Sequence, residues 1–314
     1  MTAPPLDAVR RCHGVLNALH STVYFTPYLD KELAAYGIDD PMAAYLAGRA
    51  APMGPVGAGP VTATFYSFHH DLVARHVPRV WDLAAPETVW AARLRAADAT
   101  LRRALGDRAV DGPEVAEAAE LALRAAEGCR RPGRPLYAAH ADRPVPGEPH
   151  LALWYAATLL REHRGDGHVA ALDGAGLDGL EALVSHSASG EGMPKEIVMT
   201  KRGWTEEDWA AAEERLRGRG LMAADGTLTP QGRRLRRDLE ETTDRMDLAP
   251  YERLGARDTG RLTELADGLV GEAARSGVFP PVLLGFFTGR DHTDKHSGGG
   301  TGGGTGNDAE GTPR

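Results

Sequence analysis

The amino-acid sequence predicts a mainly α-helical protein with one short β-hairpin, and three patterns support this prediction. Proline repeatedly stands where a helix could begin, apolar residues recur at helical spacing, and one Asp-Gly pair separates two short strand-like segments. Proline suits the first turn of a helix because its missing N–H would have no intrahelical partner there. These patterns predict helices, rather than a sheet, as the framework of the chain.

The proline signals also place the individual helices. We expect helices over residues 27–36, 41–48, 86–105 and 113–127, and another from Pro149 that carries the segment HLALWYAATLLREH. A glycine follows the two longest of the first four helices, at 106 and 128, as expected where a helix ends.

Composition and charge exclude several classes of protein. The chain has 314 residues, 42% of them hydrophobic and 25% charged, which is enough for one large domain or two ordinary ones. The net charge of −8 lowers the expectation of nucleic-acid binding, although a basic stripe can lie on an acidic protein. Cys12 and Cys129 form no CxxC pair, so no disulfide framework or thiolate zinc site is expected. With no signal-peptide pattern and no long apolar run, we expect a cytoplasmic protein without a membrane partner, and we expect no cofactor.

The segment from Gly48 to Phe68 does not fit the helical pattern. It contains glycine at 54, 57 and 59 and proline at 52, 55 and 60, which predict an ordered, irregular loop. A phosphate-binding loop is disfavoured, because prolines remove backbone donors and the segment has no lysine. Two interpretations remain: a rigid turn before a buried helix or strand in VTATFYSF, or a loop that lines a small-molecule pocket with Arg49.

Composition also divides the chain into units. Residues 130–149 contain five prolines and few apolar anchors, which is typical of a connection. We therefore expect a helical N-terminal region over 1–145, a second unit over 146–250, a C-terminal helix over 251–290 and a disordered tail over 291–314. The tail is almost free of apolar side chains and cannot bury enough surface to offset the entropy of ordering.

The second unit has the element order of a helix-turn-helix followed by a hairpin. Two short helices are expected on either side of Gly174–Gly176, the first beginning at His168. Thr205 and Asp208 predict a capped helix start. Asp225-Gly226 predicts a turn between two short strands, 221–223 and 227–229, and a long helix begins near Pro230.

These elements carry a family resemblance. The segments RLRGRGL and ADGTLTPQG, with Gly220, Leu221, Leu228, Thr229 and Gly232, resemble the winged-helix domain of MarR-type regulators. The segments AGRAAP, GPVGAGPVTATFYSF and LREHRGDGHVAALDGAGLDGLEAL resemble a group of actinobacterial winged-helix-like proteins. The resemblance implies a helical N-terminal region plus a winged helix-turn-helix unit with a short β-wing, and a homodimer. It supplies architecture rather than an activity.

DNA recognition is not favoured by the helix expected to enter the major groove. That helix, about 177–189, carries Asp178 and Glu181 but no lysine, arginine, asparagine or glutamine. Affinity for DNA depends strongly on cationic contacts to phosphate. The alternative DNA-binding residues are Arg233, Arg234 and Arg236 after the wing, but a solvated face balanced by neighbouring carboxylates is the favoured explanation for them.

The segment REHRGDGH, residues 161–168, concentrates charged side chains between apolar runs. In one interpretation it is a polar joint between helices, where Asp166 or Gly167 caps a helix beginning at His168. In another it lines a pocket for a small polar or anionic molecule. In a third it is catalytic, with His163, Asp166 and His168 as acid–base groups. The two histidines are five residues apart, whereas a helical metal site needs three or four, so no metal is expected.

These patterns together predict a protein that binds a small molecule between its two regions. The candidate ligand-binding residues are Arg49, His163, Arg164, Asp166 and His168. A DNA-binding regulator and an enzyme that uses the 161–168 cluster are the two alternatives, and the catalytic residues of such an enzyme are unknown.

Overall fold

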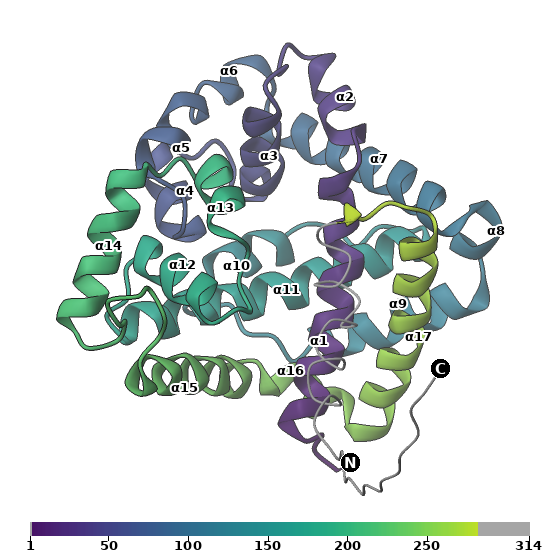
Figure 1. Cartoon of the computed structure of the whole chain (residues 1–314). Coiled ribbons are helices and arrows are strands. Elements are labelled where there is room, and N and C mark those ends of the chain that lie inside the picture. Colours follow the sequence, from purple (N-terminus) through teal and green to yellow (C-terminus); the bar gives the residue numbers. More distant parts are fainter. Residues whose placement is uncertain (1, 282–314) are drawn as a thin grey trace, which may run out of the picture.

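Helix α11 (Pro149–Gly174) runs through the middle of the molecule (Figure 1). Every residue from His150 to Leu160 on it is buried, and α1, α7, α9, α10 and α15 pack against it. A helix that is apolar on all sides is stable only where other elements cover it completely. The run HLALWYAATLL therefore forms the centre of the fold because none of its faces suits water.

The computed structural model describes residues 2–281, and the predicted disordered tail over 291–314 lies outside the described residues. The other elements, with 3-10 helices marked η, are α1 (Leu6–Ser21), η1 (Thr22–Phe25), α2 (Tyr28–Ala34), α3 (Pro41–Ala50), η2 (Ala51–Met53), α4 (Ala58–Phe65), α5 (His70–His76), α6 (Val80–Leu83), α7 (Pro86–Leu105), α8 (Asp107–Val110), α9 (Pro113–Ala126), α10 (Pro135–Ala141), α12 (Gly179–Ala188), α13 (Lys195–Arg202), α14 (Glu206–Gly218), α15 (Pro230–Met246), α16 (Leu248–Leu254) and α17 (Ala256–Arg275).

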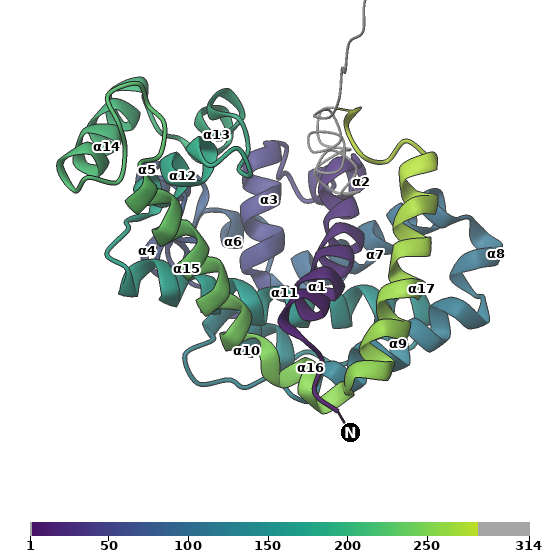
Figure 2. The same cartoon turned by 60° about the horizontal axis from the view of Figure 1, so that its bottom comes forward.

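Two hydrophobic cores hold these elements together. The larger core takes side chains from residues 9–160 and 251–279, so α17 packs beside α1 although the two helices are far apart in sequence (Figure 2). The smaller core takes side chains from residues 171–239 and joins the end of α11 to α12–α15. The expected division at residues 145, 250 and 290 stays a prediction.

The mainly α prediction is confirmed, and so are the helices that proline was expected to open. Helices α3, α7, α9 and α11 each carry proline at the start, as predicted. Asp40 strengthens the start of α3, because its carboxylate accepts backbone N–H bonds from Met42 and Ala43. Thr205 forms the expected capping box with Asp208 at the start of α14.

The predicted β-wing is wrong. Within residues 2–281 no β-strand forms, and between 221 and 229 only one isolated antiparallel bridge joins Met222 to Leu228. The Asp225-Gly226 turn does form, and Asp225 accepts hydrogen bonds from both Thr227 N–H and Thr227 Oγ1. The arms are joined by two backbone hydrogen bonds, from Ala223 N–H to Thr227 O and from Thr229 N–H to Leu221 O, so the hairpin is too short for a ladder. Leu221 and Met222 are buried in the smaller core.

The 48–68 segment is more helical than expected. Helix α3 continues to Ala50, η2 follows at once, and α4 covers Ala58–Phe65. The irregular parts are therefore residues 54–57 and 66–68. Of the helix or strand expected in VTATFYSF, a helix forms over its first five residues.

The joint expected at 161–168 is also wrong, because α11 passes through this segment without a break. Glycine inside a helix lowers stability by about 1 kcal/mol relative to alanine. The presence of glycine at position 167 is explained by its surroundings. A Cβ at this position would lie 1.8 Å from Arg134 Nη1. Arg134 occupies that space and donates a hydrogen bond to the carbonyl oxygen of His163 at 2.9 Å.

Candidate ligand-binding cavity

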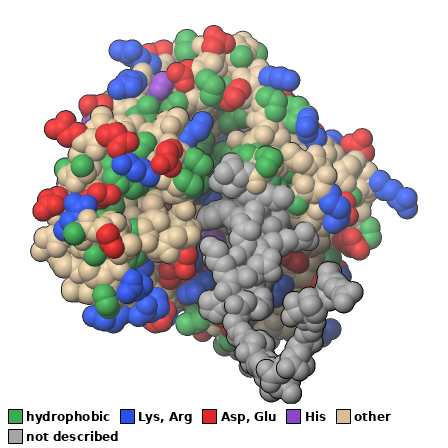
Figure 3. Space-filling model, in the orientation of Figure 1, with side chains coloured by type: hydrophobic (Ala, Val, Ile, Leu, Met, Phe, Trp, Pro, Cys, Tyr) green, Lys and Arg blue, Asp and Glu red, His purple; other side chains and the backbone are tan. Residues whose placement is uncertain are grey.

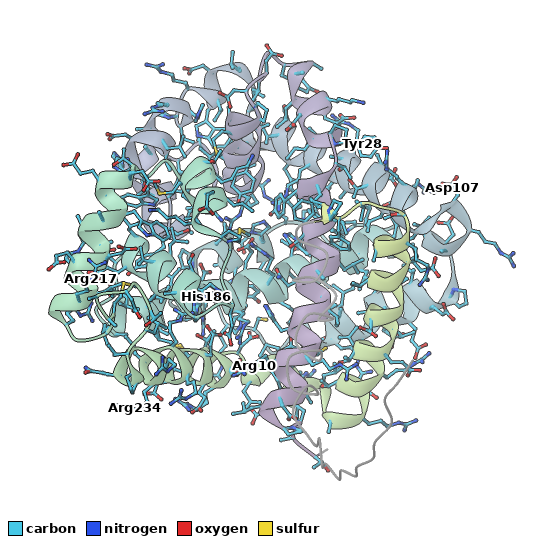
Figure 4. The ribbon with its side chains drawn as sticks, viewed as in Figure 1. Arg10, Tyr28, Asp107, His186, Arg217 and Arg234 are labelled. Carbon is cyan, nitrogen blue, oxygen red and sulfur yellow. The ribbon has the colours of Figure 1, made fainter. Side chains whose placement is uncertain are left out.

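A cavity of about 520 Å³ opens beside the middle of α11. Its walls come from α1, α3, α4 and α10 of the N-terminal region and from α11, α12 and α15. Figure 4 labels two lining residues from different walls, Arg10 on α1 and His186 on α12. This volume falls in the range of pockets that hold small molecules, roughly 300–1,000 Å³.

In one part of this cavity, two arginines share one carboxylate. We call these three residues, Arg49, Arg161 and Glu162, the inner cluster. Arg49 Nη2 lies 3.3 Å from Glu162 Oε2, and Arg161 Nη1 lies 2.5 Å from Glu162 Oε1. Burial favours a raised pKa for Glu162, but the two guanidiniums outweigh burial and lower the pKa to about 2. The carboxylate is therefore charged at neutral pH.

A second group of charges, the outer cluster, joins α11 to α15 and α1. Arg164 Nη1 lies 2.7 Å from Asp244 Oδ1, and Arg164 Nη2 lies 3.5 Å from Glu240 Oε2. Arg10 donates from Nε to Asp244 Oδ2 at 2.9 Å. Each arginine of the outer cluster thus has a carboxylate partner.

Asp166 caps a helix, but not the one that the sequence suggested. Its Oδ2 accepts hydrogen bonds from the backbone N–H groups of Leu136 and Tyr137, at 3.0 and 2.9 Å. These groups begin α10, which lies about thirty residues earlier in the chain. Burial raises the pKa of Asp166 to about 7, against the two backbone hydrogen bonds, which lower it. The predicted cap of a helix beginning at His168 is wrong because no helix begins there.

The two histidines of the segment face different partners. His163 Nδ1 lies 2.8 Å from Asp247 Oδ1, whereas His168 Nδ1 lies 2.9 Å from Thr243 Oγ1. Burial and the charges of Arg236 and Arg164 lower the pKa of His168 to about 4, so its ring is neutral at pH 7. Among residues 2–281, no three His, Cys, Asp or Glu side chains are placed to hold a metal ion.

The structure brings four of the five predicted residues to the cavity. Arg49, Arg164, Asp166 and His168 line it, whereas His163 does not and instead pairs with Asp247. The α1 wall, which is formed by Arg10, His13 and Asn17, was not predicted from the sequence. Their spacing of three and four residues places polar side chains on one face of a helix, and this signal was present in RRCHGVLN.

Next to the cavity, two helix pairs have the form of a helix-turn-helix. One is the end of α11 with α12, as predicted. The other is α13 with α14, joined through Gly203, which adopts a left-handed conformation with φ +80°. Helix α14 leads directly into the short hairpin at Met222–Leu228.

The comparisons with known proteins agree with this architecture. A model described as a helix-turn-helix family matches residues 9–280. The chain belongs to this helix-turn-helix family. A search of curated proteins and a search of solved structures each found no match. The described part of this family member also contains no helix with the length and apolarity needed to cross a membrane.

In this helix-turn-helix protein, the start of α12 is covered. A Cβ on Gly179 would lie 2.1 Å from the carbonyl oxygen of Tyr66, so the helix begins in direct contact with the N-terminal region. Asp178 and Glu181 pair with Arg215 on α14, at 2.8 and 3.0 Å. Both carboxylates at the start of α12 are therefore already paired with an arginine of the same chain, although Asp178 remains exposed.

Helix α14 is more exposed, but its surface is acidic. Its first turn carries Glu206, Glu207 and Asp208. Farther along the helix, Arg217 pairs with Glu213 and Glu214, at 2.9 and 3.2 Å. The N-terminal residues of a recognition helix contact base edges, and three carboxylates there repel the phosphates of DNA.

Cations gather instead on α15. Arg233, Arg234 and Arg237 are exposed, and none of them forms an ion pair within residues 2–281. Lys and Arg side chains gather over α15 at the lower left of Figure 3, where Figure 4 labels Arg234. Arg236 is not part of this surface, because it is buried and pairs with Glu240 at 3.1 Å.

Proposed function

We propose that this helix-turn-helix protein binds a small molecule in the cavity between its N-terminal helices and its helix-turn-helix unit. The observation that carries the proposal is the convergence of buried charged side chains from both regions on one cavity. Arg49 comes from α3, Glu162 and Arg164 come from α11, and each is at most 9% exposed.

Energetics support a binding role for these groups. Removing charged side chains from water costs free energy, and even a good ion pair between them seldom repays that cost. Well-packed apolar residues of similar size would stabilise this position equally well or better. Charged groups gathered at a cavity of this size are therefore better explained by a ligand than by stability.

The test is a thermal-shift screen of a metabolite library with two matched variants. Gly165 lines the cavity, and a Cβ on it would meet only Glu162 Oε2 at 3.8 Å, so the side chain of Gly165→Leu can begin without strain and should occupy part of the cavity. Gly174→Leu lies on the same helix, where a Cβ would meet nothing within 4 Å, and it does not line the cavity. A ligand stabilises the folded state by mass action.

We expect library compounds that raise the melting temperature of the wild type and of Gly174→Leu but not that of Gly165→Leu. Equal shifts in both variants would place the ligand elsewhere and contradict the proposal. A library in which no compound shifts the wild type would also count against it.

A DNA-binding regulator is the second candidate, and family membership together with the exposed arginines of α15 favours it. In this alternative Arg233 and Arg234 contact backbone phosphates, which confers affinity without sequence selectivity. The acidic surface of α14 argues against tight, selective binding. We therefore propose weak DNA binding at physiological salt.

Three finer assignments remain proposals. The MarR-type likeness rests on the segments around Gly220 and Thr229 and implies a homodimer, which light scattering of the purified protein would test. An enzyme that uses His163, Asp166 and His168 would need these groups to meet at one substrate. They contact Asp247, the start of α10 and Thr243 respectively.

A further inference from the structure

Positive charge exceeds negative charge around the inner cluster. Arg49 and Arg161 both pair with the single carboxylate of Glu162. Arg93 is fully buried and donates to the carbonyl oxygen of Gly48 and to the hydroxyl of Tyr24, and its charge helps to lower the pKa of Glu162. Three guanidiniums thus act on one carboxylate. The outer cluster does not share this excess, because Arg10 and Arg164 have Asp244 and Glu240 as partners.

Donors of the inner cluster also remain unused. Arg49 is nine-tenths buried, and its Nε has no hydrogen-bond partner. Arg161 uses Nε for Asn17 and Nη1 for Glu162, so its Nη2 donates to no acceptor within residues 2–281. The side chain of Arg161 is 24% exposed, which leaves Nη2 open to the cavity. Unused guanidinium donors are suited to a carboxylate or another oxyanion.

An apolar surface lies beside these donors. The ring of Phe65 stands 4.3 Å from the guanidinium carbon of Arg49, and both residues line the cavity. Leu136 and Val169 add aliphatic surface to the same cavity. A molecule with a charged end and an apolar body would match both features.

We propose that the ligand of this cavity is an organic carboxylate whose anionic end lies against Arg161 and Arg49 and whose apolar body lies against Phe65. This inference rests on the proposed function, since it names the class of molecule that the cavity holds. A cation is disfavoured by the three guanidiniums, and a neutral molecule would leave their excess charge uncompensated.

The experiment is a titration with compounds that share a body and differ only in charge. Sets of acids, alcohols and amines on phenyl and on linear C4–C10 bodies would be compared by calorimetry on the full chain. Within each set that binds, we expect the acid to bind at least about tenfold more tightly than the alcohol and the amine, from the typical strength of a charged hydrogen bond.

Two arginine variants then locate the anionic end. Arg161→Gln should weaken binding of the best acid about 10- to 100-fold. The control is Arg10→Gln, which lines the same cavity but already pairs with Asp244 and should change affinity less than about threefold. Thermal melts of both variants would show that they are folded, and Arg161→Lys, which keeps the charge, should recover part of the lost affinity.

The possible outcomes separate this inference from the proposed function. If an alcohol or amine binds at least as tightly as its acid, and Gly165→Leu abolishes that binding, the cavity binds ligands but the carboxylate assignment is wrong. Equal loss of affinity in Arg161→Gln and Arg10→Gln would likewise overturn the placement of the anion. If no acid, alcohol or amine binds, the carboxylate assignment fails, and the metabolite screen decides the proposed function on its own.

Discussion

The arginines of the cavity and the arginines of α15 are the same residue type in opposite surroundings. Arg49 is buried, stacks on Phe65 and shares Glu162 with Arg161. Arg233 and Arg234, in contrast, are exposed and have no ion-pair partner within residues 2–281. The sequence makes the α15 group look more conspicuous, because RRLRR is a compact basic run.

This difference shows that a high density of charge in the sequence does not identify the charged side chains that most affect stability or ligand binding. An exposed arginine is solvated and screened, so its removal changes little. A buried guanidinium that shares a carboxylate affects its neighbours strongly, because water is absent there. The predictions below test this contrast, beginning with the largest effect.

Glu162→Gln should have the largest effect on stability. It removes the carboxylate that Arg49 and Arg161 share and leaves the buried guanidinium of Arg49 without a counter-charge. We expect a loss of about 3–5 kcal/mol in the free energy of unfolding, measured by urea denaturation. Glu241→Gln on α15 breaks only an exposed 3.7 Å pair with Arg245 and should change stability by less than about 0.5 kcal/mol. Similar losses for both variants would show that the two regions do not differ as we describe.

Asp166→Ala should have an intermediate effect, because Oδ2 alone accepts both N–H bonds at the start of α10. The expected loss is about 0.5–2 kcal/mol, the usual cost of losing a helix cap. Asp166→Asn retains one carbonyl oxygen that can accept both bonds, so it should lose clearly less. Equal destabilisation of the two variants would mean that the carboxylate charge, rather than the cap, is what matters.

His168 should make the protein less stable in acid. Folding lowers the pKa of His168 from 6.5 to about 4, because the folded protein favours the neutral ring. The contribution of this neutral ring to the free energy of unfolding is therefore complete above pH 6.5 and is lost as the pH falls toward 4. His168→Gln keeps a partner for Thr243 but cannot titrate. Between pH 7 and pH 5, we expect the melting temperature of the variant to fall less than that of the wild type. Parallel curves would show that folding does not lower the pKa of His168.

The smallest effect on stability is expected for the triple variant Arg233→Gln, Arg234→Gln and Arg237→Gln. These side chains are exposed, so the free energy of unfolding should change by less than about 0.5 kcal/mol. Fluorescence anisotropy with duplex DNA should show weak binding by the wild type that decreases steeply with salt and is largely lost in the variant. Nanomolar, sequence-selective binding by the wild type would instead support the regulator alternative.

Much of the fold could be predicted from local signals. Proline at the starts of α3, α7, α9 and α11 determined where those helices begin, since the cause lies in the proline ring itself. The β-wing could not be excluded in this way. Its turn signal at Asp225-Gly226 was correct, but whether a turn extends into strands depends on how the arms pack against the rest of the fold, where Leu221 and Met222 join the smaller core.

The site could be predicted only in part, because its contacts also depend on packing between segments that are distant in sequence. Residues 161–168 were recognised as unusual, but their glycines suggested a break in a helix that is continuous. The space that Gly167 leaves is filled by Arg134, and the cap that Asp166 provides belongs to α10. Neither partner is near in sequence, so no local pattern could indicate it.

The sequence by itself determined a helical framework, the polar segment in the middle of α11 and the acidic first turn of α14. Each of these follows from backbone geometry or from the charge of neighbouring residues. Only the tertiary structure decided which arginines share Glu162, which helix Asp166 caps and which residues form the cavity wall on α1. Ion pairs and cavities arise between surfaces that folding brings together, and their energies depend on burial, which is a property of the folded chain as a whole.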